Sequence, residues 1–458
     1  MREKELIIFR GFEDGGLLRD MTWLMENYEN EYYNEEDRAA LLYECIHRLI
    51  EMGGSYGFYG NLWHCYLTNL LVGNENSYSM MCEIRGEIKG TVNQAVLHDI
   101  RIFREFFDYD FAPMAERLHA PEIRWVLDYE SDGQKSRIYT GEICRRICEL
   151  ARRLAESGTP EHMKAILTRF YGDYGTGKFG LHKAFRIVHD EAGVRVEPIR
   201  NIAHVRLSDL VGYEIAKKKL TDNTEAFVEG RRANNCLLYG DAGTGKSSSI
   251  KGIVNEYYDR GLRIIEIYKH QFRDLNEVIS QIKYRNYKFI IYMDDLSFEE
   301  FETEYKYLKA VIEGGLEKKP DNVLIYATSN RRHLVRERFS DRQEREDDLH
   351  KGDTVQEKVS LSERFGERIY FGAPDKKEFQ QIVRTLAQRA GIDMPEDQLL
   401  AEANKWELSH GGLSGRTAQQ FIDYLLGTGC ARFGFVSAAP NSQTAERQGD
   451  YDENICGH

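Results

Sequence analysis

Apolar residues recur every three to four positions through most of the first 200 residues. The pattern is clearest in residues 35–53, 93–118 and 140–157. Residues at this spacing share one face of an α-helix, and that face is buried against neighbouring helices. The sequence therefore predicts an all-helical N-terminal domain over residues 1–200.

The pattern changes near residue 201, where short apolar runs begin to alternate with helical segments. Five of these runs are rich in β-branched or aromatic residues and are predicted strands: residues 235–239, 263–267, 288–293, 322–328 and 368–371. Strands that alternate with helices are typical of a parallel sheet with helices on its faces. We therefore expect an α/β core over residues 201–372, built on a parallel five-stranded sheet flanked by helices.

Helical periodicity returns after the fifth predicted strand. Residues 375–391, 395–410 and 414–427 each carry an apolar stripe at helical spacing, which predicts a small helical C-terminal domain over residues 373–435. The last residues, 436–458, are rich in small and polar side chains and are expected to form a flexible tail.

Composition and charge fit this organisation. At 458 residues the chain is too long for one ordinary domain. Its 41% hydrophobic and 12% aromatic residues are enough for sizeable cores, which excludes a disordered or fibrous protein. The net charge of -13 gives no general attraction to nucleic acid or anionic lipid, and no stretch reaches a membrane-spanning length. We expect a cytoplasmic protein that binds no membrane.

The cysteines are scattered along the chain and show no metal-ligand spacing. We expect them to be reduced thiols without a structural metal. Cys144 and Cys148 share one face of a predicted helix, and the surrounding apolar residues favour a place in the buried stripe of that helix over metal binding.

The strongest chemical signal is the segment GDAGTGKSS at residues 240–248, which follows a predicted strand and precedes a predicted helix. It fits the phosphate-binding pattern G-x-x-x-x-G-K-[ST], and this context disfavours a chance glycine-rich turn. Backbone N–H groups of such a loop surround phosphates, Lys246 can reach the β and γ phosphates, and Ser247 can bind Mg²⁺. The predicted nucleotide-binding residues of the loop are Gly240, Asp241, Ala242, Gly243, Thr244, Gly245, Lys246, Ser247 and Ser248.

Residues 172–179, GDYGTGKF, copy the glycine and lysine spacing of this loop. Phe179 replaces the Mg²⁺-binding hydroxyl, and the residues before the copy are predicted to be helical, which argues against a second nucleotide site. We expect a glycine-rich surface turn, whose N–H groups and Lys178 can still touch a nucleotide or a neighbouring subunit.

Two carboxylates directly follow the predicted strand of residues 288–293. The carboxyl ends of parallel strands share one edge with the phosphate loop, so Asp294 and Asp295 should lie near bound phosphate. Asp294 is the expected Mg²⁺ carboxylate, and Asp295 is the expected base or positioner of the attacking water. An acidic turn at the strand end is the alternative. Glu299 is a second candidate carboxylate, and a weaker one because it lies beyond the strand end.

A polar strand end also follows residues 322–328. Asn330 can orient the attacking water or sense the γ phosphate. Threonine, serine and asparagine are common in ordinary loops too, so this assignment depends on the neighbouring motifs.

Together, the phosphate loop, the paired acids, the polar strand end and the arginines after it resemble the AAA+ ATPases over about residues 205–430. Within that superfamily the chain looks most like the uncharacterised bacterial ATP-binding proteins of domain of unknown function 815. The closer likeness lies in the segments SDLVGYE, NNCLLYGDAGTGKSS, GLRIIEI, DDLSFE, YATSNRRHL, SLSERFG and SGRTAQQF. The resemblance implies an AAA+ P-loop NTPase core with a helical C-terminal lid, and the binding of ATP and Mg²⁺.

The resemblance also implies roles for individual residues. Val211 and Gly212 would lie near the adenine. Asn330 would be the sensor-1 residue and Arg416 the sensor-2 arginine. Arg364 would be the finger that reaches the γ phosphate of a neighbouring subunit, which implies an oligomer.

Three features qualify this likeness. The commonest AAA+ pattern has glutamate at the position of Asp295, so hydrolysis can be slow or need closure induced by a partner. Arg368 competes with Arg364 for the finger role. Residues 331–348 carry balanced charges, which is typical of a solvated face, but they lie between sensor and finger in a position suited to a partner contact.

The sequence therefore predicts a homo-oligomeric ATPase that hydrolyses Mg-ATP to ADP and phosphate. Hydrolysis would drive conformational change on an unknown protein or nucleic acid client of the N-terminal domain. The predicted catalytic residues are Asp295, Asn330, Arg364 and Arg416, and the predicted metal ligands are Ser247 and Asp294. One alternative is a nucleotide-gated switch or loader that hydrolyses slowly or not at all. A weaker alternative is a small-molecule P-loop kinase, for which the sensor and SERFG segments would be unnecessary.

Overall fold

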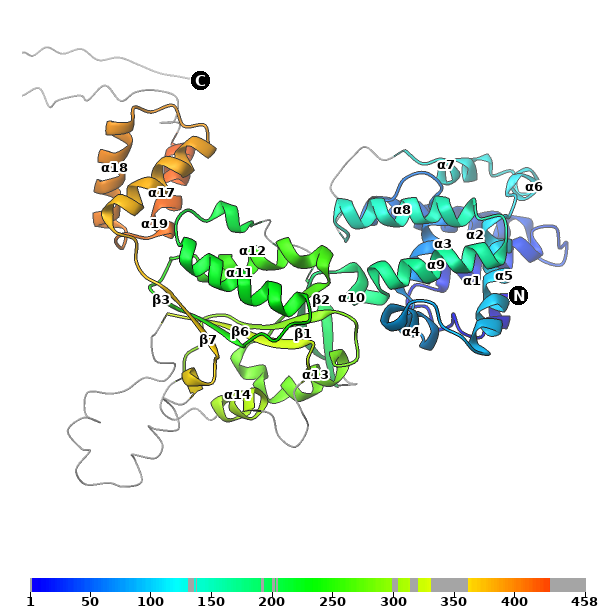
Figure 1. The fold of residues 1–458 in the computed structure, drawn as a ribbon. Helices are drawn as coiled ribbons and strands as arrows, with labels where there is room; N and C mark the ends of the chain where they lie inside the picture. The colour runs from blue at the N-terminus through cyan, green and yellow to red at the C-terminus, as the bar shows by residue number, and fades with distance from the viewer. Residues whose placement is uncertain are drawn as a thin grey trace, which may run out of the picture. The chain divides into compact units, whose positions relative to one another are not determined.

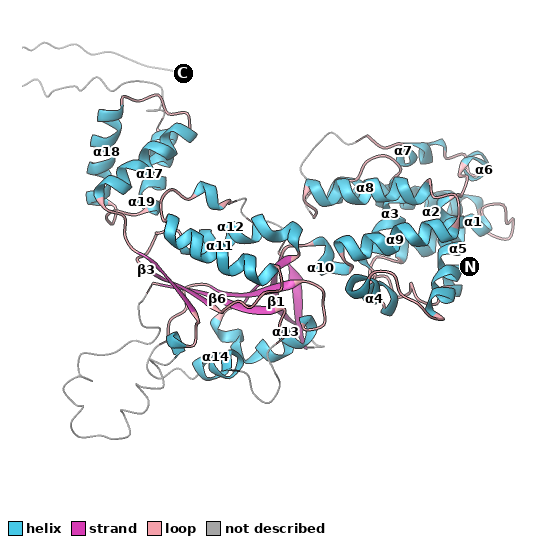
Figure 2. Ribbon diagram, viewed as in Figure 1, coloured by secondary structure: helices cyan, strands magenta, loops and turns pink. Residues whose placement is uncertain are grey.

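The computed structural model describes residues 2–130, 136, 138–190, 193–199, 202, 205–298, 304–313, 320–330 and 361–428 of the chain. It divides into two compact units, residues 1–372 and 373–458. Figure 1 traces the chain through a bundle of helices and an α/β sheet in the first unit, and a small helical second unit. Figure 2 shows that the strands are confined to the first unit.

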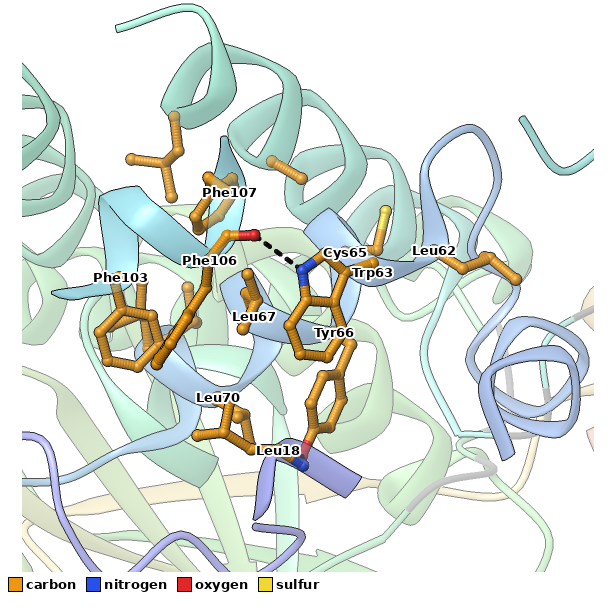
Figure 3. Close-up of a cluster of buried hydrophobic side chains, with 14 of the residues drawn as sticks. Leu18, Leu62, Trp63, Cys65, Tyr66, Leu67, Leu70, Phe103, Phe106 and Phe107 are labelled. Carbon is orange, nitrogen blue, oxygen red and sulfur yellow. Dashed lines mark hydrogen bonds between the residues drawn. The ribbon is translucent and has the colours of Figure 1, made fainter. Parts of the chain in front are cut away.

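The helices of the N-terminal part pack around one apolar core. They are α1 Gly16–Asn27, α2 Glu35–Tyr56, α3 Leu62–Gly73, α4 Ser77–Arg85, α5 Val92–Phe107, α6 Ala112–Arg117, α7 Arg124–Leu127, α8 Gly141–Ala155, α9 Pro160–Tyr174 and α10 Gly177–Leu181. Asn34 caps α2 by accepting a hydrogen bond from the Glu36 N–H. Figure 3 shows part of the core, where Trp63 Nε1 donates to the Phe106 carbonyl oxygen at 2.8 Å.

The predicted helix of residues 93–118 is in fact two helices. α5 ends at Phe107 and α6 begins at Ala112. The Asp110 carboxylate accepts a hydrogen bond from the Ala112 N–H, and Pro113 lies in the first turn of α6, where a missing N–H costs little. Residues 108–111 thus separate two helices within a continuous apolar stripe.

The α/β part is built on one seven-stranded sheet. The strands are β1 Ala184–Asp190, β2 Gly193–Pro198, β3 Cys236–Gly240, β4 Leu262–Glu266, β5 Lys288–Met293, β6 Val323–Ser329 and β7 Glu367–Phe371. Their order is β2-β1-β4-β5-β6-β3-β7. β2 runs antiparallel to β1, and every other pair of neighbours is parallel. The carboxyl ends of the parallel strands therefore share one edge, where sites of α/β proteins form.

Helices cover both faces of the sheet (Figure 1). They are α11 Glu214–Val228 and α12 Lys246–Tyr257 on one face, and α13 Leu275–Ile282 and α14 Glu304–Glu313 on the other. Successive residues of a strand point to opposite faces, so β5 feeds two separate cores. Phe289 and Ile291 enter one core, and Ile290 and Tyr292 enter the other.

The sequence pattern predicts five strands of this sheet and misses two, because β1 and β2 lie within the residues predicted to be all-helical. In β1, Phe185 and Ile187 are buried while Arg186 between them is exposed, an alternation that identifies a strand. Both strands are short and carry charged residues on one face, so the pattern is weak against the stronger helical signal before it. The all-helical prediction is therefore wrong for residues 184–198, and the sheet is mixed rather than purely parallel.

A buried ion pair joins the helical bundle to the sheet. Arg285, between α13 and β5, donates to both carboxylate oxygens of Glu83 in α4, at 2.9 and 2.8 Å. Arg285 also donates to the Thr176 carbonyl oxygen at 2.9 Å and pairs with Glu75 at 3.1 Å. The Arg285 and Glu83 side chains are only 3% and 2% exposed. Each buried charge is stabilised by the other, because water cannot solvate either side chain unless the junction opens.

The glycines of the near-copy GDYGTGKF belong to this junction. A Cβ on Gly175 would lie 1.3 Å from Tyr287 Oη, and a Cβ on Gly177 would lie 2.0 Å from Glu75 Oε1. Both glycines are buried, and they follow a helix, α9, rather than a strand. The expectation of a surface turn is wrong for residues 175–179, which form a largely buried joint where Gly175 and Gly177 give room to side chains of neighbouring elements. Residues 172–174 are the exposed end of α9.

Replacing Arg285 with methionine is expected to lower the free energy of unfolding by about 3–5 kcal/mol, because the buried Glu83 carboxylate loses its partner. Replacing Glu83 with methionine as well should recover much of this loss, since the buried carboxylate is then removed with its partner, and Glu75, which also pairs with Arg285, is 30% exposed and can be solvated. Urea unfolding followed by tryptophan fluorescence measures the change, because Trp23, Trp63 and Trp125 all lie in the helical bundle.

The matched control for this variant is Arg260→Met. Arg260 pairs with Glu225 and Glu229, each at 3.0 Å, but its side chain is 43% exposed. The Arg260→Met substitution should lower the free energy of unfolding by about 0–1 kcal/mol, as for other surface ion pairs. Equal losses of unfolding free energy in the Arg285 and Arg260 variants would show that burial does not strengthen the contribution of the Glu83–Arg285 pair to stability.

The described part of the second unit is a bundle of helices. They are α17 Lys376–Arg389, α18 Glu396–Ser409 and α19 Gly415–Gly427, at the positions that the helical periodicity predicts. Asp375 and Glu378 form a capping box at the start of α17. Ser414 caps α19 by accepting a hydrogen bond from the Thr417 N–H at 3.0 Å.

Candidate functional site

The phosphate-loop segment begins where β3 ends. Gly240 has φ +136° and Gly245 has φ +91°, backbone conformations that favour glycine. A Cβ on Gly240 would lie 2.0 Å from the Phe371 carbonyl oxygen, which accepts a hydrogen bond from the Asp241 N–H at 3.0 Å. α12 starts at Lys246, and the first N–H groups of a helix have no partner within it. The loop and the helix start can therefore surround a phosphate group.

Lys246 is held inside the loop. Its ammonium donates to the carbonyl oxygens of Gly240 at 3.1 Å and Asp241 at 2.6 Å, and the residue is only 5% exposed. Thr244 Oγ1 donates to the Asp241 carbonyl oxygen at 2.8 Å, which closes the loop on itself. A lysine in this position can exchange the carbonyl oxygens for phosphate oxygens.

Ser247, Asp294 and Thr328 converge beside the loop. The Ser247 and Thr328 hydroxyls donate to the same atom, Oδ1 of Asp294, at 2.7 and 2.6 Å. Desolvation alone would raise the pKa of Asp294, but the hydrogen bonds to its carboxylate outweigh it and hold the pKa below its ordinary value. The carboxylate is therefore ionised at neutral pH. Hydroxyl and carboxylate oxygens are ligands that Mg²⁺ prefers, so Ser247 and Asp294 fit this ion.

Asp295 and Asn330 form a second pair at the same edge of the sheet. Asn330 Nδ2 donates to Asp295 Oδ1 at 2.8 Å, and both residues are exposed. Asp295 has φ +50°, a left-handed conformation that aspartate and asparagine adopt more readily than most residues. The Asp295 N–H donates to Thr328 Oγ1 at 2.9 Å, which fixes this turn. The turn leaves the Asp295 carboxylate open to water.

Thr328 is a site residue that the sequence analysis did not select. It lies next to the last residue of β6, the strand between β5 and β3, and its hydroxyl contacts the Asp294 carboxylate and the Asp295 N–H. Thr328 belongs to the polar strand end noted in the sequence, where a role was predicted for Asn330 alone. A hydroxyl at the carboxyl end of a strand beside an acidic strand end is the feature that would have identified it.

The segment before α11 lies beside the phosphate loop. A Cβ on Gly245 would lie 2.5 Å from Leu210 Cδ2, so Val211 and Gly212 follow a residue that contacts the loop directly. Lys217 in α11 fixes this segment by donating to the Leu210 carbonyl oxygen at 2.9 Å. The adenine contacts of Val211 and Gly212 stay a prediction.

Arg364 does not lie at the phosphate loop of its own chain. Arg364 is half-buried just before β7, and Arg368 is exposed within it. Because β7 runs parallel to β3, Arg364 lies at the amino edge of the sheet, and the phosphate loop lies at the carboxyl edge. Arg416 belongs to the second unit, in the first turn of α19. The roles of all three stay predictions.

Several predicted features lie outside the described residues: Glu299, the charged segment 331–348 and the tail 436–458. Within the described ranges, no cluster of three or more histidine, cysteine, aspartate or glutamate side chains is arranged to hold a metal ion. No helix in the part of the chain that the structure describes is long and apolar enough to cross a membrane.

The class of the protein follows from the sheet and the loop. A phosphate loop joins β3 to α12, β3 lies between two strands that come later in the chain, and paired acids end a strand nearby, so the chain is a P-loop protein of the AAA+ superfamily. Residues 169–429, more than half of the chain, match the family described as "Protein of unknown function (DUF815)". The chain belongs to this family. The matched residues begin within α9 and include the junction segment, β1 and β2.

Similarity to named proteins is local or weak. The chain is 34% identical over 74 residues to the replication factor C large subunit of Staphylothermus marinus, a match that spans 16% of this chain and only 17% of that protein. A RuvB mutant of Thermotoga maritima is 17% identical, with a TM-score of 0.35 over 50% of this chain and 69% of that one. The AAA domain of FIGL-1 in complex with ADP is 18% identical, with a TM-score of 0.34. This match covers 50% of this chain and 75% of that one.

Proposed function

We propose that the chain binds Mg-ATP at the phosphate loop and hydrolyses it to ADP and phosphate. The observation that carries this proposal is the 2.7 Å hydrogen bond between Ser247 and Asp294, which joins the start of α12 to the end of β5. A loop hydroxyl beside a strand carboxylate suits the divalent cation of a nucleotide. Asp295 and Asn330 lie at the same edge and supply groups that can act on water.

Each residue of the site has one task in this mechanism. The loop N–H groups and Lys246 bind the phosphates, and Ser247 and Asp294 hold Mg²⁺. The cation, when bound, neutralises negative charge on the β and γ phosphates. Asp295 accepts the proton of the attacking water, and Asn330 orients that water. Asn330 donates to Oδ1 of Asp295, so Oδ2 of the exposed carboxylate can accept from the attacking water.

The rest of the chain is proposed to couple hydrolysis to a client. The helical second unit would act as a lid that reaches the nucleotide through Arg416, in the first turn of α19. The N-terminal bundle would hold an unknown protein or nucleic acid, and its buried Glu83–Arg285 contact would carry movement from the sheet to the bundle.

Two inactive variants should complement each other if Arg364 acts between subunits. Lys246→Ala keeps Arg364 but loses phosphate binding, and Arg364→Ala keeps the loop but loses the finger. An equimolar mixture is expected to recover about a quarter of the wild-type rate of phosphate release. In a randomly assembled oligomer, about a quarter of the interfaces combine an intact phosphate loop on one subunit with an intact Arg364 on the next. The position of Arg364 at the amino edge of its own sheet supports an action on another chain.

Arg368→Ala is the control for this experiment, since Arg368 lies four residues along and is exposed. It should hydrolyse ATP like the wild type. If Arg364→Ala keeps full activity and Arg368→Ala loses it, the finger is Arg368. If neither variant loses activity, the site is complete within one chain and the oligomer is not required.

One observation favours a second candidate function, a nucleotide-gated switch that hydrolyses slowly. The Lys246 ammonium is bonded to loop carbonyl oxygens, so it must change partners before it can bind a phosphate. Nucleotide binding alone can drive such a change. Rapid gel filtration followed by nucleotide analysis separates the two functions, because a switch retains intact ATP and a hydrolase yields ADP.

A further inference from the structure

Three buried cysteines gather in the helical bundle although one of them is distant in sequence. Cys65 lies in α3, and Cys144 and Cys148 lie one turn apart in α8. The Cys65 thiol donates to Cys148 Sγ across 3.8 Å. Figure 3 shows Cys65 beside Trp63 on α3, in the apolar core that also contains the other two. Cys144 and Cys148 are buried as their apolar stripe predicts, and Cys65 of another helix meets them there.

The surroundings of Cys148 favour its thiolate. Hydrogen bonds from the thiols of Cys144 and Cys65, and from the Tyr59 N–H, outweigh the effect of burial and place the pKa of Cys148 below its ordinary value. Burial instead raises the pKa of Cys45 and of Cys236, which lie apart from the cluster. A thiolate in contact with a second thiol is the arrangement from which a disulfide forms.

The cluster lies beneath a short loop, residues 57–61, which joins α2 to α3 and whose Phe58 is fully buried. Cys144 Sγ donates to the Gly57 carbonyl oxygen at 2.6 Å, and Cys65 Sγ donates to the Tyr59 carbonyl oxygen at 3.6 Å. Tyr59 itself is 45% exposed. Opening of this short loop would therefore admit a small oxidant to the sulfur atoms without unfolding of the bundle.

We propose that Cys65 and Cys148 form a reversible disulfide that links α3 to α8 when the protein meets hydrogen peroxide. The Cys148 thiolate attacks one peroxide oxygen, so that an S–O bond forms, the O–O bond breaks and hydroxide leaves as water after taking a proton. Cys65 sulfur then attacks the sulfenic sulfur, an S–S bond forms, and the S–O bond breaks to release a second water with the Cys65 proton. Two thiols and one peroxide thus give one disulfide and two waters.

The geometry requires only a small movement. The two sulfur atoms must approach from 3.8 Å to about 2.05 Å. Rotation of the two side chains about their χ1 bonds can supply this shift within the core. The link would fix α8, whose Arg146 pairs with Asp259 after α12 at 3.0 Å, so oxidation would act on a helix that touches the nucleotide-binding part.

The first test maps the disulfide in the full-length chain, with Cys430 and Cys456 replaced by serine because they lie outside the described residues. Protein treated with hydrogen peroxide is denatured, alkylated with N-ethylmaleimide, digested without reductant and analysed by mass spectrometry. The expected product is a peptide pair joined through Cys65 and Cys148 that disappears on reduction. The cysteines outside the cluster should be recovered fully alkylated.

A second measurement keeps the proposal falsifiable if a variant fails to fold. The disulfide closes a separation of 83 residues, so peroxide should raise the midpoint of thermal unfolding of the wild type by about 5–10 °C. Cys144→Ser should keep this rise, and Cys65→Ser should lose it. Oxidation of Cys45 as fast as Cys148, or a disulfide between Cys144 and Cys148 in place of the expected one, would overturn the proposal.

Discussion

Replacing Asp295 with asparagine is expected to lower the rate constant for ATP cleavage by about 10²–10⁴-fold, because the variant loses the group that accepts the proton of the attacking water. ATP should bind with unchanged affinity, since Asp295 lies outside the loop that is proposed to bind the phosphates. The variant should also fold normally. Asparagine tolerates the φ of +50° and can still accept the hydrogen bond from Asn330.

Single-turnover phosphate release and fluorescent-ATP titration separate these two effects for the Asp295→Asn variant. Asp222→Asn is the matched control, because Asp222 lies on α11 and pairs with Lys218 at the surface. It should cleave ATP like the wild type. Wild-type turnover by Asp295→Asn would show that another group accepts the proton, and loss of ATP binding would place Asp295 among the binding residues.

Lys246→Ala is expected to weaken ATP binding by roughly 30- to 4,000-fold, which corresponds to the loss of about 2–5 kcal/mol for one partner of a buried charge pair. Lys246 is almost fully buried within the loop, so no exposed side chain can take its place. The variant also frees the Gly240 and Asp241 carbonyl oxygens that the ammonium now bonds. Equilibrium titration with fluorescent ATP in the presence of Mg²⁺ measures the loss.

Lys218→Ala is the control for charge removal, since Lys218 lies on α11 and is 76% exposed. Its affinity for ATP should equal that of the wild type. Circular dichroism and thermal unfolding of the Lys246→Ala variant distinguish lost binding from lost fold. Tight ATP binding by a folded Lys246→Ala variant would mean that the phosphates do not lie in this loop.

Buried, regular elements were the easiest to predict from the sequence. The strand of residues 288–293 is apolar and buried after its first residue, Lys288, and its buried residues serve both faces of the sheet, so composition alone identifies it. The loop of residues 240–248 is identifiable because each glycine and the lysine has a separate physical role. The sequence also predicts that Asp294 lies near Ser247, and the structure places Oγ and Oδ1 2.7 Å apart. The catalytic roles of these residues stay predictions.

The features that the sequence could not reveal depend on contacts between distant segments. β1 pairs with the adjacent β2, but it joins the sheet through β4, from which it is separated by a long stretch of chain. The GDYGTGKF segment resembles a phosphate loop in spacing, but its Gly175 is required by the Tyr287 ring, which comes from another element. Cys65 likewise meets Cys148 only because α3 packs against α8. No local pattern encodes such partners.

The most direct test of the central claim is free-phosphate release by the purified full-length chain with Mg-ATP, measured over a wide range of protein concentration. We predict release that requires Mg²⁺ and a rate per subunit that rises with concentration, because Arg364 completes the site of a neighbour. A rate per subunit that stays flat would contradict the shared site. Bound ATP that remains intact at every concentration would contradict hydrolysis itself.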